Sequence, residues 1–105
     1  MERELAKCLE FDIADNDHGG LMLGGHFEYE GGGCQGLGYQ IDIKFVQMFM
    51  EAFGVPRLQD VNGKSCWVTH DGDGISKIEP LHKGEGTPFE IDKWPLRKKY
   101  LAQKR

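Results

Sequence analysis

The chain lacks any long apolar run. Lys44, Gln47 and Glu51 interrupt the longest one, so no stretch approaches the ~18 residues that a membrane-crossing helix needs. The N-terminal sequence MERELAKCLE is charged and has no apolar segment of the kind found in signal peptides. We therefore expect a cytoplasmic protein that does not engage a membrane.

Cysteine is scarce. Cys8, Cys34 and Cys66 are odd in number and widely spaced, which favours reduced thiols over a disulfide framework. The cysteines and the four histidines show no C-x-x-C or H-x-x-x-H spacing, so neither a metal site nor a cofactor is predicted. Only Cys34 is expected to be an exposed thiol. Paired with His18 or His70, it is the basis of one alternative, a small Cys/His-dependent enzyme or metal-binding protein.

Glycine is abundant, with 15 among 105 residues, about twice the usual share of ~7%. Gly31, Gly33 and Gly36 match the dinucleotide motif G-x-G-x-x-G, but that motif needs a helix opening at its third glycine. Asp71–Gly74 resembles the start of a calcium loop whose later ligands are missing. We interpret the first stretch as a flexible link over residues 31–38 and the second as a hairpin turn.

One helix is predicted over Ile41–Gly54. Its apolar residues recur at spacings of three and four, which places them on one face. Asp42 is a suitable N-cap, and Gly54 is suited to the positive φ of a helix C-terminus. The apolar face is wide and aromatic, so the helix must pack against another apolar surface.

Alternating residues predict strands on both sides of this helix, at about residues 7–13, 21–30, 65–70 and 75–80. In the first strand, Leu9, Phe11 and Ile13 should share one face and Cys8 the other. Gly24-Gly25 within the second strand indicates a bulge or a close backbone contact. Asn62-Gly63 predicts a turn, and a short fifth strand is expected near Phe89, Ile91 and Trp94.

The predicted fold is therefore α+β. An antiparallel sheet of four to five strands in β-β-α-β-β order carries one aromatic-faced helix on one face. Residues 1–96 form a single domain, and residues 97–105 form a basic C-terminal tail. The helix is expected to bury its phenylalanines against the sheet; the expected core residues are Phe45, Phe49, Phe53, Leu9, Phe11, Phe27 and Val68.

Charge is unevenly distributed along the chain. Residues 1–96 carry 17 acidic and 8 basic side chains, a balance of −9, whereas residues 97–105 carry 5 basic and no acidic ones. A body with this charge repels nucleic acid and attracts a basic protein surface. The tail is interpreted as a solvated helical turn, and it is the one segment that could contact phosphate.

Several short motifs occur together between Leu9 and Pro80. They are an Asp17-His18-Gly19 turn, Gly36-Leu37-Gly38-Tyr39, a helix ending in Phe53-Gly54-Val55, and Gly63-Lys64 before a strand. In these motifs the chain resembles a family of small proteins encoded in tailed-phage and prophage genomes. The resemblance implies a phage accessory protein, active in the bacterial host cell, and supplies no catalytic residues.

The function expected from these features is protein binding without catalysis, as an inhibitor of a bacterial defence system of the anti-CRISPR kind. The partner would present a basic surface, as a nucleic-acid-binding defence protein does. A self-assembling structural protein is a further alternative. The candidate partner-binding residues are aromatic or polar residues expected in loops and the acidic residues near them: His18, Gln35, Tyr39, Trp94, Glu28, Glu30, Asp71 and Asp73.

Overall fold

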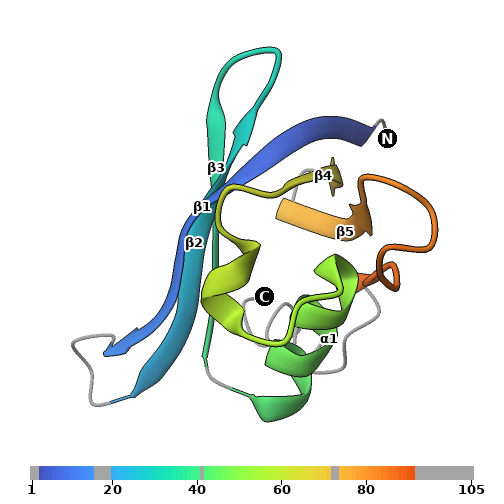
Figure 1. Cartoon of the computed structure of the whole chain (residues 1–105). Coiled ribbons are helices and arrows are strands. Elements are labelled where there is room, and N and C mark those ends of the chain that lie inside the picture. The colour runs from blue at the N-terminus through green and yellow to red at the C-terminus, as the bar shows by residue number, and fades with distance from the viewer. Residues whose placement is uncertain (1–2, 16–19, 41, 72–73, 92–105) are drawn as a thin grey trace.

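The computed structural model describes residues 3–15, 20–40, 42–71 and 74–91 (Figure 1). In chain order these form β1 (Arg3–Asp15), β2 (Leu21–Tyr29), β3 (Cys34–Gln40), α1 (Ile43–Phe53), the 3-10 helix η1 (Leu58–Val61), β4 (Ser65–Asp71) and β5 (Gly74–Pro80). The expected α+β class is confirmed. The chain differs from the expected order in placing three strands, and not two, before the helix.

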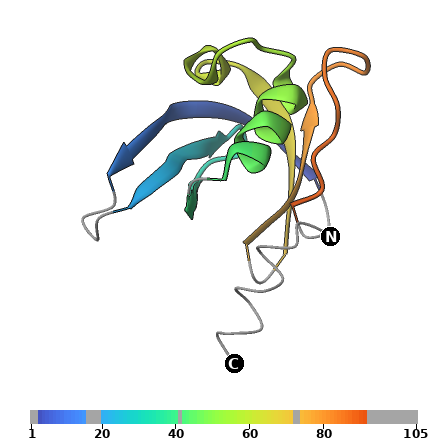
Figure 2. The same ribbon diagram turned by 90° about the horizontal axis from the view of Figure 1, so that it is seen from below.

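All five strands belong to one antiparallel sheet with the order β3-β2-β1-β4-β5. Helix α1 lies over one side of this sheet (Figure 2). We call that side the helix face and the opposite side the outer face. The ring centroids of Phe49 on α1 and Phe11 on β1 are 4.9 Å apart, so helix and sheet share one core.

The prediction of a flexible link over residues 31–38 is wrong. Only Gly31–Gly33 lie in the turn, and β3 begins at Cys34. Gly32 N–H donates to Tyr29 C=O at 3.0 Å, and Tyr29 N–H donates to Gly33 C=O at 3.0 Å. The loop between β2 and β3 spans residues 30–33. Within it Gly32 has a φ of 104°, a conformation that residues other than glycine rarely adopt. Because the glycines of β3 have no side chains, its sequence does not show the alternation of apolar and polar residues by which a strand is predicted.

The predicted alternation of β1 is also wrong, because the strand contains a bulge. Glu10 has a φ of 59°, and the register with β2 shifts between Leu9 and Asp12. Two residues of β1 therefore lie opposite Gly25, as in a β-bulge. Cys8 and Phe11 are both buried on the helix face, and Leu9 is only half-buried. The close contact predicted at Gly24-Gly25 is confirmed at this point.

The Asn62-Gly63 turn is confirmed as well, although it joins η1 to β4 and is not a hairpin. Lys64 N–H donates to Val61 C=O at 3.0 Å, and Gly63 has a φ of 87°, which is the geometry of a type II turn. The Asn62 side chain accepts from Phe11 N–H at 2.7 Å and donates to Phe11 C=O at 3.0 Å. The Asn62 side chain thereby hydrogen-bonds to β1 at a position that precedes the first residue of β4.

Helix α1 begins and ends where the caps predict. The Asp42 carboxylate accepts from Lys44 N–H at 2.8 Å, and Gly54 has a φ of 64°. The segment after β5 packs on the last turn of the helix, where Thr87 N–H donates to Glu51 C=O at 2.8 Å. A Cβ on Gly86 would lie 2.5 Å from the carbonyl oxygens of Glu51 and Ala52, so only glycine fits this contact.

The core is formed by the helix face together with the segment that follows β5. Phe89 forms a single β-bridge with Ile78, and its ring centroid lies 5.0 Å from that of Phe45. This bridge replaces the short strand expected near residues 89–94, and Trp94 lies outside the described residues. No helix among the described residues is long and apolar enough to cross a membrane.

Candidate partner-binding surface

The paired strands β1 and β2, with Glu30 just after them, form the most acidic described part of the molecule. We call this segment the acidic ribbon. Its basic side chains are Arg3 and Lys7. Its acidic side chains are all exposed: Glu4, Glu10, Asp12, Asp15, Glu28 and Glu30. Figure 1 shows β1 and β2 extending beyond the region of the sheet that α1 covers, and the six carboxylates of the ribbon are exposed.

Basic side chains lie beside only some of these carboxylates. Glu10 Oε2 lies 3.8 Å from His26 Nδ1, and Lys7 is the cross-strand neighbour of Glu28 in the register of β1 and β2. Arg3 is directed away from the ribbon, because its guanidinium stacks 4.4 Å from the centroid of the Trp67 ring on β4. The ribbon therefore keeps a net negative charge along its length.

The structure separates the residues that the sequence grouped as candidates. Glu28 and Glu30 are exposed on the acidic ribbon. Gln35 and Tyr39 belong to β3 and Asp71 ends β4, so the expectation that they lie in loops is wrong. His18, Asp73 and Trp94 lie outside the described residues.

Sequence reasoning missed a polar cluster at the end of the helix face. Tyr29 Oη donates to Gln35 Oε1 at 2.7 Å, and the rings of Tyr29 and His70 are 5.6 Å apart between centroids. His70 Nε2 is 2.5 Å from Glu4 Oε2. These residues come from four strands, so the cluster could be recognised only once the sheet order was known.

Burial in this cluster perturbs the tyrosine. It raises the pKa of Tyr29 from 10.0 to about 12, with the negative charge of Glu4 and the nearby Cys66 thiol adding to the effect. Tyr29 therefore stays a neutral hydrogen-bond donor to Gln35 well above physiological pH.

The three thiols fall into two classes. Cys8 and Cys66 are buried and Cys34 is exposed, as expected, although Cys34 lies in β3 and not in a flexible link. The pKa of Cys8 is raised because its thiol is hydrogen-bonded to Cys66 and is shielded from water. The registers place Cys34 on the outer face and His70 on the helix face, so these two are not brought together. The described residues contain no group of three potential metal ligands.

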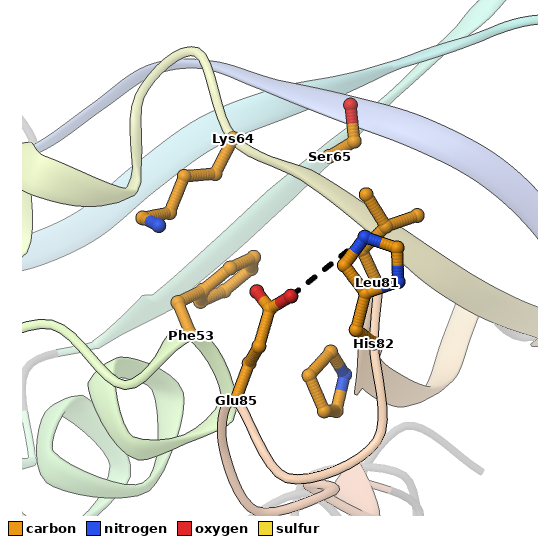
Figure 3. Close-up of a pocket in the computed structure, with 7 residues that line it drawn as sticks. Phe53, Lys64, Ser65, Leu81, His82 and Glu85 are labelled. Carbon is orange, nitrogen blue, oxygen red and sulfur yellow. Dashed lines mark ion pairs between the residues drawn. The ribbon is translucent and has the colours of Figure 1, made fainter.

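A small pocket of about 150 Å³ opens between the end of α1, the start of β4 and the segment after β5 (Figure 3). His82 Nε2 lies 3.8 Å from Glu85 Oε1 across it, and both side chains are well exposed. Exposed ion pairs contribute at most about 1 kcal/mol. None of the candidate residues from the sequence lines this pocket, so the acidic ribbon remains the leading candidate surface.

Comparison of the chain with protein-family models, with curated proteins and with solved structures finds no match. The candidate surface is therefore defined by its own geometry and charge.

Proposed function

We propose that this chain acts by binding a protein partner through the acidic ribbon, and that the partner's docking surface is basic. The observation that carries the proposal is the charge imbalance of the acidic ribbon, which has six exposed carboxylates and only two basic side chains, Arg3 and Lys7. Complementary charge speeds association and excludes partners of the wrong sign.

The nature of the partner follows from the same charge. Duplex DNA carries one negative charge per ~1.7 Å of helix axis, and a protein surface that binds it is basic. The acidic ribbon is a strand pair with exposed carboxylates, so its charge has the same sign as that of DNA. We infer that the partner is a nucleic-acid-binding protein whose groove the ribbon occupies. With the resemblance to small phage-encoded proteins, this supports the narrower proposal of an inhibitor of a bacterial defence system, of the anti-CRISPR kind.

The proposal is tested by capture from bacterial lysate. The tagged chain is washed at low and at high salt, and bound proteins are identified by mass spectrometry. We expect one stoichiometric nucleic-acid-binding protein that is retained at low salt and lost at high salt, because screening weakens contacts between exposed charges. DNA should compete with the chain for that purified protein.

Charge variants then locate the contact. Glu28→Gln/Glu30→Gln removes two carboxylates from the acidic ribbon, and Glu51→Gln/Glu85→Gln removes two exposed carboxylates elsewhere. Only the first pair should weaken binding, by about 30-fold if each of the two contacts contributes ~1 kcal/mol. Equal effects of the two pairs, or binding indifferent to salt, would contradict the proposal.

A further inference from the structure

Strand β3 ends the sheet with an open edge. It pairs with β2 on one side, in a continuous register from Cys34 to Gln40, and no strand of the described chain pairs with its other side. Natural edge strands are blunted by charged residues, by proline or by bulges. The sequence of β3, CQGLGYQ, contains no charged residue and no proline. We propose that β3 pairs with β3 of a second copy of this chain, forming a symmetric antiparallel dimer with one continuous sheet.

The hairpin geometry identifies the backbone groups at the open edge. Tyr29 N–H donates to Gly33 C=O, and hydrogen-bonded pairs alternate along antiparallel strands. Of the residues in β3, Gln35, Leu37 and Tyr39 therefore bond to β2. The N–H and C=O groups of the even-numbered residues point away from the sheet; these are Cys34, Gly36, Gly38 and Gln40.

A two-fold axis at Leu37 satisfies all of these groups. It places Gly36 opposite Gly38 of the second copy and Cys34 opposite Gln40 of the second copy. Each such pair exchanges two hydrogen bonds, as in any antiparallel ladder. Leu37, which is buried on the helix face, meets its own counterpart at the axis. The central Gly-Leu-Gly makes this register symmetric at the contact itself.

The absence of charge on β3 allows a second copy to approach at this edge. The chain as a whole has a net charge of −4, so two copies repel each other over most of their surface. Strand β3 is an uncharged surface, whereas the neighbouring acidic ribbon carries the excess charge. A basic segment would find no carboxylate along β3, so the edge itself gives it no advantage over an uncharged strand.

The mass of the protein in solution tests the proposal. Sedimentation equilibrium over a concentration series should give twice the 11.9 kDa of the chain. Gly36→Pro removes an edge N–H without removing a bond to β2, and it should shift the protein to the monomer mass. Gly36→Ala is the matched control: its Cβ has 3.9 Å to the nearest atom, and it keeps the N–H, so the dimer should persist.

A second variant tests the register and does not depend on the proline variant folding. Hydrogen-bonded antiparallel partners have Cα atoms about 5.5 Å apart, within the range for a disulfide. Oxidation of Gln40→Cys with diamide, which takes up the two thiol hydrogens, should link Cys34 to the new cysteine of the second copy. Within one copy the two sites are roughly 20 Å apart along an extended strand. Gln59→Cys on η1 is exposed and should not crosslink.

Each result decides the proposal. A monomer at every concentration would overturn it, as would a dimer that persists in a folded Gly36→Pro variant. Absence of the Cys34 crosslink in the dimer would exclude the proposed register. The measurements use the isolated chain, so they stand or fall separately from binding to a basic partner.

Discussion

At the scale of single residues, the bulge in β1 depends on a glycine in the neighbouring strand. The Phe11 ring lies directly over Gly25, where a Cβ would come within 2.5 Å of the ring and 2.8 Å of the Phe11 Cα. Phe11 in turn contacts Phe27 and Phe49, with centroid separations of 5.2 and 4.9 Å. One missing side chain on β2 therefore allows the central strand to turn its aromatic residue into the core.

We expect Gly25→Ala to destabilise the protein by about 1–3 kcal/mol, the usual cost of overpacking a core. Gly24→Ala is the matched control, because its Cβ would have 3.9 Å to the nearest atom. It should be neutral or slightly stabilising. Urea unfolding monitored by tryptophan fluorescence measures both. Equal stability of the two variants would show that Phe11 moves aside without cost.

Tyr29 gives a prediction on pH. Its pKa is 10.0 in a model peptide and about 12 in the folded protein, because burial and Glu4 disfavour the phenolate. Because the folded state favours the neutral phenol, Tyr29 contributes to the stability of the folded state at pH values below its unfolded pKa. This contribution is lost as pH rises from 10 through about 12.

We therefore expect the stability of wild type to fall with pH above 10 more steeply than that of Tyr29→Phe, which has no phenol to ionise at this position. Absorbance of tyrosinate gives an independent measurement, since the variant should lack the tyrosine that ionises near pH 12. Tyr29 has an ordinary pKa if wild type and variant lose stability in parallel and the ionisation step near pH 12 remains in the absorbance titration of the variant.

At the scale of elements, Asn62 joins η1 to the bulge in β1 across 51 positions of sequence. Asn62 precedes the first residue of β4, and its side chain supplies both hydrogen bonds that a paired strand would give to Phe11. Asn62→Ala should cost about 1–3 kcal/mol, because a backbone N–H and a backbone C=O lose their partner. Gln59→Ala, on the exposed side of η1, should change stability by less than about 0.5 kcal/mol.

Hydrogen exchange makes this prediction specific to the element. Asn62→Ala should speed exchange of the Phe11 amide, which donates to the asparagine in wild type. Unchanged protection at Phe11, together with unchanged stability, would mean that water replaces the side chain without cost.

The elements differ in how far the sequence determined them. Helix α1 was predictable because its caps and apolar face are local signals within Asp42–Gly54. Strand β3 was missed because its glycines carry no alternation, and the β1 bulge was missed because it depends on contact with Gly25. In the candidate surface, Glu28 and Glu30 were predicted from the sequence as acidic residues near expected loops, whereas the Tyr29–His70–Glu4 cluster depends on strand order.

At the scale of the whole molecule, charge and hydrophobic burial are placed in different regions. The core is formed by the helix face, α1 and the segment around Phe89. Most charges of the acidic ribbon remain on exposed side chains beside this core. Their mutual repulsion opposes folding and would be relieved by a basic partner, so the same feature links the stability of the chain to its proposed function.

This repulsion predicts that salt stabilises the isolated protein. The Debye length falls from about 30 Å at 0.01 M salt to about 3 Å at 1 M, which screens the carboxylates from one another. The melting temperature should therefore rise with sodium chloride. It should rise less in Glu28→Gln/Glu30→Gln than in Glu51→Gln/Glu85→Gln, because only the first pair reduces the charge of the acidic ribbon. A melting temperature that falls with salt would show that attractive pairs such as His70–Glu4 outweigh the repulsion.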